Sequence, residues 1–287
     1  MRYYRLHSGG SYKLLAADDE IAYDLTAVKP RLDRFSDLAA AAYAADTSVD
    51  RLAAELTSGA PVVDVDAANV ELPVLPEEVW AAGVTYEISE AAREAESSMP
   101  EMYLNVYDAD RPEIFFKSTP SRTVGPGEPI GIRGDSSWNV PEPELGIVLY
   151  DGKIVGFTVG NDVSSRSIEG DNPLYLPQAK VYDRCCSLGP CVTGAEEISD
   201  PHDLTMSMTI RRDGTSIYAD ETSTAEMVRS CEELVEYWTD HNTVPELGVL
   251  LTGTSLVPGE EFTLEPGDEV RIAIEGIGDL TNPVVEV

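Results

Sequence analysis

Two runs of β-branched and other apolar residues, 144–149 and 153–159, read as neighbouring β-strands near the middle of the chain. Between them stands Tyr150-Asp151-Gly152, and Asp-Gly between two such runs is a strong signal for a tight hairpin turn. We therefore expect strands at 142–149 and 153–162 to pair antiparallel, so that the end of the second strand returns beside the start of the first.

The expected hairpin brings three acidic side chains together. Side chains alternate along a strand, so Glu142 and Glu144 point to the same face, and Asp162 lies close to both. Three converging carboxylates repel one another unless some are protonated or a cation lies among them. Their oxygens suit a hard divalent ion, Mg²⁺ or Mn²⁺. Three solvated acids in an acidic protein are the alternative, and the apolar surroundings favour the metal.

The remaining pattern predicts two regions. Residues 1–70 form a small N-terminal domain, with short strands, helices near 32–45 and 49–56, and a connector at 57–66 that is rich in Ser, Gly, Ala, Pro and Asp. Residues 71–287 form a larger domain in which glycines and prolines separate short β-rich runs. Few helices interrupt these runs, so we expect an α+β fold that is mostly β.

Two helices are expected in the larger domain. Strong helix formers fill 87–97. A second helix is predicted at 224–238, because Ser223 is followed three residues later by Glu226, the spacing of a capping box, and apolar residues then recur with helical periodicity. The proline-containing stretch 172–178 is expected to form a loop over the site.

The net charge of the chain argues against two classes of binding partner. The chain carries 52 Asp and Glu against 20 Lys and Arg, a formal net charge of −32. Such a charge repels nucleic acid and anionic lipid, so neither is an expected partner. The acids are interleaved with apolar residues rather than gathered in a tail, which is typical of a halophilic protein whose self-repulsion is screened by salt. An acidic protein from a low-salt cell is the alternative.

The chain shows no membrane or export signal. No apolar run approaches the roughly 18 to 20 residues that span a bilayer, and residues 1–6 are not followed by the apolar core of a signal peptide. The spacing of Cys185, Cys186, Cys191 and Cys231 fits no zinc motif. We expect reduced thiols in a cytoplasmic protein.

Several motifs of the larger domain together resemble the fumarylacetoacetate hydrolase superfamily over about 72–287. They are Phe-Phe-Lys (115–117), Pro-Glu-Pro-Glu-Leu (141–145), Gly-Asn-Asp-Val-Ser (160–164) and Thr-Gly-Thr (252–254). Within that superfamily the chain is most similar to the archaeal 2-keto-3-deoxy-D-arabinonate dehydratases. That likeness lies in Tyr-Asp-Ala (107–109), Arg-Pro-Glu-Ile-Phe-Phe-Lys (111–117), Asn-Pro-Leu-Tyr-Leu-Pro-Gln (172–178) and Lys180.

The resemblance implies a roll-like mixed β-sheet, Mg²⁺ held by Glu142, Glu144 and Asp162, and a homo-oligomer, either a dimer or a tetramer. It also implies dehydration of a small sugar acid, a 2-keto-3-deoxy-pentonate, to 2,5-dioxopentanoate in oxidative pentose degradation. The chain departs from the superfamily in two places. Residues 83–88 lack the histidine that carbon–carbon hydrolases use to activate water, and residues 164–167 are Ser-Ser-Arg-Ser where many relatives have Ser-Ala-Arg-Asp.

The dehydration needs a base and an acid. Lys180 is the first candidate for the base, because a lysine that is partly buried or near a divalent ion has a lowered pKa. A surface lysine is the commoner alternative. Glu113 is the candidate for assisting departure of the hydroxyl, and an exposed acid at a strand edge is its alternative.

Four further residues are expected to contact the substrate. Lys117 lies in an apolar run and needs a partner when buried, which is either a substrate oxygen or one of the metal-binding carboxylates. Thr254 belongs to a glycine-containing turn whose hydroxyls and N–H groups suit a carboxylate, although a plain turn also explains it. Tyr86 and Arg166 are expected to orient the sugar hydroxyls or the carboxylate.

Two other function classes remain open. One is an acylpyruvate or fumarylpyruvate hydrolase or an oxaloacetate decarboxylase on the same scaffold, against which the missing histidine weighs. The other is a non-catalytic protein that binds a metal or a sugar acid. The pair Lys180 and Glu113 weighs against that class, because binding alone needs no base.

Overall fold

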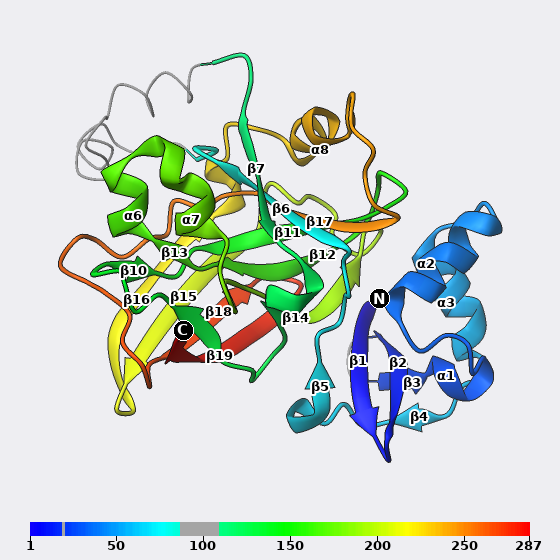
Figure 1. The fold of residues 1–287 in the computed structure, drawn as a ribbon. Coiled ribbons are helices and arrows are strands. Elements are labelled where there is room, and N and C mark those ends of the chain that lie inside the picture. The colour runs from blue at the N-terminus through cyan, green and yellow to red at the C-terminus, as the bar shows by residue number, and fades with distance from the viewer. Residues whose placement is uncertain (19–20, 87–108) are drawn as a thin grey trace.

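The structure, a computed structural model, describes residues 1–18, 21–86 and 109–287, and a long sheet runs through this part of the chain (Figure 1). The sheet has twelve strands in the order β4-β3-β2-β1-β14-β12-β11-β17-β6-β7, with β5 paired to β1 and β8 to β14. Its strands are β1 (Arg2–Ser8), β2 (Ser11–Asp18), β3 (Ile21–Asp24), β4 (Val62–Val63), β5 (Val70–Glu71), β6 (Glu78–Gly83), β7 (Glu113–Ser118), β8 (Thr123–Val124), β11 (Pro143–Tyr150), β12 (Lys153–Asp162), β14 (Cys186–Gly194) and β17 (Leu247–Leu251).

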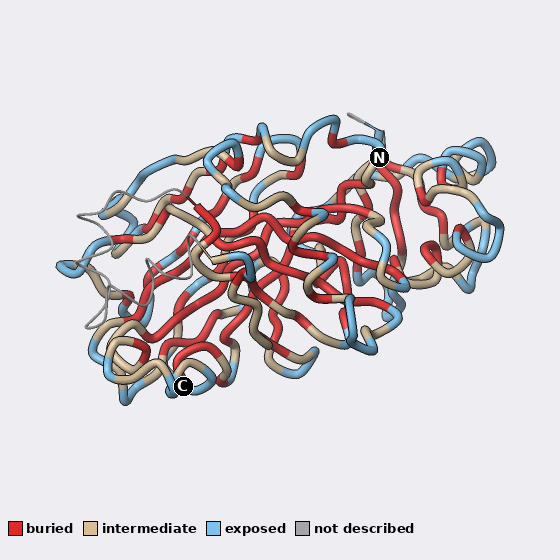
Figure 2. The backbone as a smooth tube through the Cα atoms, turned by 90° about the horizontal axis from the view of Figure 1, so that it is seen from above, coloured by how far each residue is buried: buried red, intermediate tan, exposed pale blue. Residues whose placement is uncertain are grey.

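A second sheet of five strands packs against the first, in the order β16-β15-β18-β19-β9. Its strands are β9 (Ile130–Ile132), β15 (Thr205–Arg212), β16 (Thr215–Ser223), β18 (Glu269–Ile274) and β19 (Gly278–Glu286), while β10 (Asn139–Val140) and β13 (Ser164–Ser165) form a separate pair. Leu145 and Val159 of the first sheet share one buried cluster with Met206 and Ile272 of the second. The buried backbone runs through the middle of the molecule in Figure 2, so the main core lies between the two sheets.

The predicted central hairpin is confirmed. β11 and β12 pair antiparallel, with Glu144 opposite Gly160. Asp151 and Gly152 both adopt positive φ, 48° and 72°, which is the backbone that a type I′ hairpin turn requires. Every residue of β11 is buried, because β12 and β17 flank it in the sheet. The acidic end of the hairpin therefore lies inside the protein.

The N-terminal region forms a lobe beside the larger body (Figure 1). Its helices are α1 (Leu25–Val28), α2 (Phe35–Ala44) and α3 (Val49–Thr57), and a short 3-10 turn, η1, covers Ala67–Asn69. The two longer helices lie where the sequence pattern predicts helices. β1 continues the large sheet by pairing with β14 through Arg2 and Tyr3, so the lobe shares a sheet with the rest of the chain.

The helix predicted at 224–238 is wrong in its first turns. Ser223 caps only a 3-10 turn, η4 (Thr224–Glu226), and α8 (Cys231–Thr239) begins later with Ser230 as its N-cap. The cause is tertiary: Met227 forms a β-bridge with Tyr86, and the Val228 N–H donates to the Thr85 carbonyl at 2.8 Å. This pairing draws the intervening residues into extended backbone.

The stretch predicted to be a loop at 172–178 is largely helical. It contains η3 (Pro173–Tyr175) and most of α7 (Leu176–Lys180), and it follows α6 (Arg166–Asp171). Both prolines lie at the starts of these elements, where the missing N–H costs no hydrogen bond. A further 3-10 turn, η2, covers Pro120–Arg122.

The helix predicted at 87–97 and the residues Tyr107 and Asp108 of one motif lie outside the described residues. In the part of the chain that is described, no helix has the length and apolar character needed to cross a membrane.

Candidate active site

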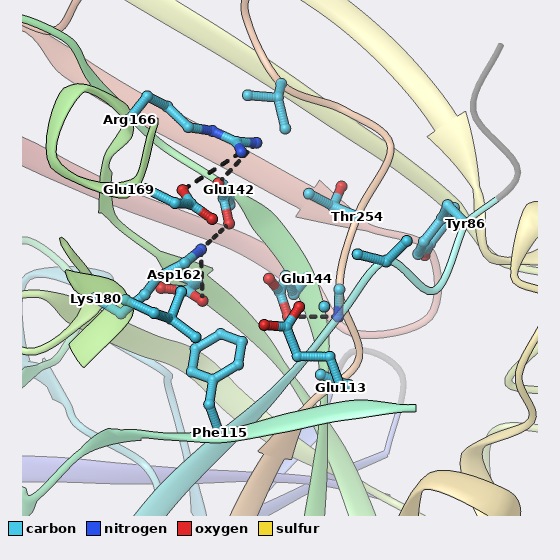
Figure 3. Close-up of a pocket in the computed structure, with 16 residues that line it drawn as sticks. Tyr86, Glu113, Phe115, Glu142, Glu144, Asp162, Arg166, Glu169, Lys180 and Thr254 are labelled. Atoms are coloured by element: carbon cyan, nitrogen blue, oxygen red, sulfur yellow. Dashed lines mark hydrogen bonds and ion pairs between the residues drawn. The ribbon is translucent and has the colours of Figure 1, made fainter. Parts of the chain in front are cut away.

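A pocket lies where the ends of β6, β7, β11 and β12 meet α6, α7 and the turn after β17 (Figure 3). Eight of the nine site residues predicted from the sequence line it, all except Lys117. They are Tyr86, Glu113, Glu142, Glu144, Asp162, Arg166, Lys180 and Thr254. Residues far apart in the sequence thus meet in one cavity.

Three buried acids, Glu142, Glu144 and Asp162, form what we call the carboxylate triad. One oxygen from each lies within 4.8 Å of the others. The Asp162 N–H donates to the Glu142 carbonyl at 2.9 Å, which fixes the two strand ends side by side. Glu144 Oε2 accepts a hydrogen bond of 2.6 Å from the Gly253 N–H. Gly253 has a φ of +80°, a backbone that favours glycine, so the turn after β17 is shaped to hold Glu144.

Three cations pair with two members of the triad, Glu142 and Asp162. Lys180 Nζ donates to Glu142 Oε2 at 2.7 Å, to Ser164 Oγ at 2.7 Å and to Asp162 Oδ2 at 3.3 Å. Arg166 Nη2 lies 3.1 Å from Glu142 Oε1, and Lys117 Nζ lies 2.5 Å from Asp162 Oδ1. Glu144 has no such ion pair among the described residues, and its negative charge is the least compensated of the three.

The pKa values of Glu142 and Glu144 shift in opposite directions because of this distribution of charge. Burial alone would raise the pKa of Glu142, but Lys180 and Arg166 more than offset it and hold that pKa below its ordinary value. Burial, then the charges of Asp162 and Glu142, raise the pKa of Glu144 well above its ordinary value. Without a cation at this position, the protonated form of Glu144 is favoured over its ordinary balance.

Lys180 differs from the sequence-based expectation in two ways. It is the last residue of α7 rather than part of a loop. Its pKa is not lowered: burial favours the neutral amine, but Asp162 and Glu142 outweigh burial and raise the pKa well above its ordinary value. In the metal-free site these two acids therefore outweigh the burial on which the expectation relied.

Glu113 lies half-buried at the start of β7. Burial, followed by the negative charge of Glu169, raises the pKa of Glu113 to about 7. A carboxyl group with this pKa exists in both protonation states near neutral pH, which is the property required of a general acid or base.

Lys117 has the second of its two expected partners, a metal-binding carboxylate, and Thr254 lines the pocket as expected. Lys117 is fully buried behind Asp162, donates to the carbonyls of Val163 and Lys180 at 2.9 and 2.5 Å, and does not line the pocket. Its position matches a structural ion pair rather than a contact with substrate. At the Thr252-Gly253-Thr254 turn, the Gly253 N–H is already bonded to Glu144, and Thr254 faces the pocket.

Tyr86 brings a polar group to the pocket. The side chain is 1% exposed, and its hydroxyl has no hydrogen-bond partner among the described residues. Burial raises the pKa of this phenol, so it carries its proton. A buried hydroxyl without a partner is costly, and a polar ligand in the pocket would satisfy it.

The triad fits a hard divalent cation. Its donor atoms are carboxylate oxygens alone, the ligands that Mg²⁺ and Mn²⁺ prefer. Glu142 Oε1 is buried and accepts no hydrogen bond, although Arg166 Nη2 lies 3.1 Å away. The raised pKa of Glu144 shows that its charge lacks compensation, which a bound cation would supply.

The sequence reasoning missed one acidic residue of the pocket. Glu169 lies on α6, is 9% exposed and lines the cavity. Arg166 Nη1 donates to Glu169 Oε2 at 3.4 Å. The spacing of Arg166 and Glu169 could have indicated it. Residues three apart on a helix share a face, so a helix beginning at Arg166 directs Glu169 toward the same cavity. Ser167 offers Arg166 no acid to pair with, and Glu169 makes that ion pair.

Residues 78–285 match the family model for the fumarylacetoacetate (FAA) hydrolase C-terminal domain. The chain belongs to the fumarylacetoacetate hydrolase family. The family match covers most of the chain and confirms the predicted membership, and the predicted mostly β fold is confirmed by the strands described above and by the structural likeness below.

Within this family the chain is similar to several dehydratases. It is 66% identical, over 100% of both chains, to a probable 2-keto-3-deoxyxylonate dehydratase of Haloferax volcanii. It is 43% identical to a 2-dehydro-3-deoxy-D-arabinonate dehydratase of Saccharolobus solfataricus, over 75% of this chain and 74% of that one. A solved structure of 2-keto-3-deoxy-D-arabinonate dehydratase complexed with magnesium and 2,5-dioxopentanoate aligns with a TM-score of 0.84 and 34% identity, over 100% of this chain and 99% of that one.

Proposed function

We propose that this protein is a Mg²⁺-dependent hydro-lyase that converts a 2-keto-3-deoxy-D-pentonate, derived from xylose or arabinose, to 2,5-dioxopentanoate. The observation that carries the proposal is the buried carboxylate triad with Lys180 and Glu113 in the same pocket. The dehydratase relatives support it, above all the one whose structure contains magnesium and this product.

Glu142, Glu144 and Asp162 would hold the Mg²⁺ ion, and Mn²⁺ suits the same oxygen donors. When bound, the ion polarises the keto group of the substrate and stabilises negative charge on its oxygen. The residues around it then have two tasks, which are to orient the sugar acid and to move its protons.

Glu113 and Lys180 are the proposed proton-transfer pair. Lys180 Nζ has three acceptors around it, the arrangement of an ammonium, so we assign it as the acid that protonates the departing hydroxyl on carbon 4. Glu113, with a pKa of about 7, is the base that takes the proton from carbon 3. This assignment reverses the sequence-based one. Together the two transfers remove one water, and a proton shift from carbon 5 then yields the terminal aldehyde.

Arg166, Tyr86 and Thr254 are the proposed orienting residues. Arg166 is held between Glu142 and Glu169 with its side chain 10% exposed, and a guanidinium in this position suits the carboxylate of the substrate. The unpartnered Tyr86 hydroxyl and the Thr254 side chain face the same cavity and suit the sugar hydroxyls. Lys117 is proposed to hold Asp162 in place rather than to touch the substrate.

We further propose that the enzyme is a cytoplasmic homo-oligomer adapted to high salt, with 1–70 as a separate N-terminal domain and 71–287 as the catalytic domain. The net charge of −32 supports the adaptation to salt. The family match from residue 78, just after β5 ends at Glu71, supports the domain boundary. Nucleic acid and membranes remain unexpected as partners.

The test is turnover by the purified protein with and without Mg²⁺. The substrates are 2-keto-3-deoxy-xylonate, 2-keto-3-deoxy-arabinonate, an acylpyruvate and oxaloacetate. We expect Mg²⁺-dependent formation of an aldehyde from a pentonate only. Cleavage of the acylpyruvate or CO₂ release from oxaloacetate, with no aldehyde from either pentonate, would overturn the proposal.

A further inference from the structure

Glu169 is the one acid of the pocket that the proposed mechanism does not use. It is buried, lines the cavity and is fixed by Arg166, which shares its face of α6. It is not part of the carboxylate triad. The charge of Glu169 nevertheless reaches the reacting end of the pocket, because after burial it is the main influence on the pKa of Glu113.

The pocket has an excess of negative charge. Its lining includes five acids, among them Glu113 and Glu169, against two bases, Arg166 and Lys180, which is a formal excess of three negative charges. A divalent cation reduces this excess to one, and a 2-oxo acid with a single carboxylate raises it to two. A second carboxylate on the ligand would add to this negative charge, and Arg166, the cation beside Glu169, is already paired with Glu142 and Glu169.

The pocket also offers groups that accept or exchange hydrogen bonds with a ligand. Carboxylates accept but do not donate once ionised, and the Tyr86 hydroxyl in the same cavity has no partner in the described chain. Hydroxyl groups on the ligand satisfy both kinds of group, since each can donate and accept. An apolar tail satisfies neither, and a carboxylate can accept from the Tyr86 hydroxyl but has no hydrogen to donate to the acids.

We infer that Glu169 is a specificity-determining residue, whose carboxylate accepts a hydrogen bond from a hydroxyl of the sugar acid and repels a second carboxylate at the same place. This inference rests on the proposed function for the identity of the preferred substrate. It explains how one metal site distinguishes hydroxylated 2-oxo monoacids from 2-oxo dicarboxylates, by combining an attractive contact with a repulsive one.

The test compares two stable five-carbon probes that share the 2-oxo acid group. 2-Oxoglutarate carries a carboxylate at carbon 5, and 2-oxopentanoate carries a methyl group there. Binding of each to the Mg²⁺-loaded protein is measured by calorimetry. In the wild type we expect 2-oxoglutarate to bind about tenfold more weakly than 2-oxopentanoate, and we call this difference in affinity the gap. Glu169→Gln should remove most of the gap and should change the affinity for 2-oxopentanoate by less than about twofold.

Two control variants separate specificity from structure. Glu169→Asp keeps the charge and should keep the gap, and Asp171→Asn removes an exposed charge from the same helix and should leave both affinities unchanged. With the pentonate substrate, Glu169→Gln should lower kcat/KM about tenfold, mainly through KM, since a charged acceptor becomes a neutral one. If Glu169→Gln changed the affinities for both probes equally, or left the gap unchanged, Glu169 would act only by holding Arg166.

The two proposals fail separately. If no pentonate is dehydrated, the proposed function is wrong, yet the binding gap still decides whether Glu169 rejects a second carboxylate. If a pentonate is dehydrated but the two probes bind equally well, the proposed function stands and the role given to Glu169 is overturned.

Discussion

Lys180 Nζ bridges Glu142 and Asp162, at 2.7 Å from Oε2 of the first and 3.3 Å from Oδ2 of the second. One ammonium therefore bonds two members of the carboxylate triad and competes with any metal for their oxygens. The acid proposed for the reaction and the proposed metal ligands form one connected unit, so substitutions in it have separable effects on binding and on turnover.

Replacing Lys180 by Met should abolish turnover without weakening Mg²⁺ binding. A missing general acid typically costs about 10² to 10⁴ in rate, and loss of the competing ammonium should leave the Mg²⁺ affinity equal or tighter. Calorimetric titration of Mg²⁺ and kcat measure the two effects, with Lys29→Met, an exposed lysine, as the control. Activity within tenfold of the wild type would remove Lys180 from the mechanism.

Glu144→Gln should lose metal binding and activity together. The Gln amide oxygen can still accept from the Gly253 N–H, so the fold should be retained, but the most weakly compensated charge of the triad disappears. We expect Mg²⁺ affinity to fall at least about 100-fold, measured by calorimetry, with an unchanged circular dichroism spectrum. Normal Mg²⁺ affinity in this variant would mean that the metal lies elsewhere.

Stability of the metal-free protein should depend on pH through Glu113. Its pKa rises from the ordinary value of 4.5 to about 7 on folding, so between these values the folded state binds more protons than the unfolded state. The stabilisation is complete below about pH 4.5 and is lost as the pH rises to about 7. The Tm of the wild type minus that of Glu113→Gln, measured in EDTA, should fall across this window and level off above it. A difference that is constant with pH would contradict the raised pKa.

Arg229 should act on the pocket from outside it. It donates to the carbonyls of Ala109 and Asp110, just before Glu113, and pairs with Glu233. Its neighbour Val228 holds Thr85, next to Tyr86. Arg229→Ala should lower kcat about tenfold through misplacement of Glu113, with unchanged Mg²⁺ affinity.

Two variants test this positioning role. Arg229→Lys should recover part of kcat, because a lysine can still donate to one carbonyl. Glu233→Gln removes the ion pair but keeps the bonds to Ala109 and Asp110, so it should resemble the wild type. Equal losses in Arg229→Ala and Glu233→Gln would point to a general weakening of α8 instead.

The Tm should rise with salt. The screening length falls from about 10 Å at 0.1 M salt to about 3 Å at 1 M, and a chain with a net charge of −32 gains most from that change. Calorimetry from 0.1 to 2 M KCl measures the effect. A flat or falling Tm would argue against adaptation to high salt.

Short-range sequence patterns predicted those parts of the site that depend only on neighbouring residues. Asp151-Gly152 specifies a turn by itself, and the two-residue period of a strand places Glu142 and Glu144 on one face whatever the rest of the chain does. The hairpin and the meeting of three acids follow from these two rules.

Other parts depended on contacts between distant segments. Ser223 does cap a 3-10 turn, but the helix expected to continue from it is interrupted by the bridge between Met227 and Tyr86. The pKa direction of Lys180 was missed because Asp162 and Glu142 lie 18 and 38 residues away in sequence. Glu169 was missed because its role depends on α6 lying over the pocket.

The burial of Lys117 and Lys180 also determines how the protein responds to amine-directed chemistry. The chain has five lysines, and the other three, Lys13, Lys29 and Lys153, are partly or fully exposed. A reagent that modifies primary amines should label these three lysines in the folded protein and spare the two in the interior. Mass spectrometry of labelled peptides can therefore report on opening of the active site through Lys117 and Lys180, with the other three lysines as an internal reference.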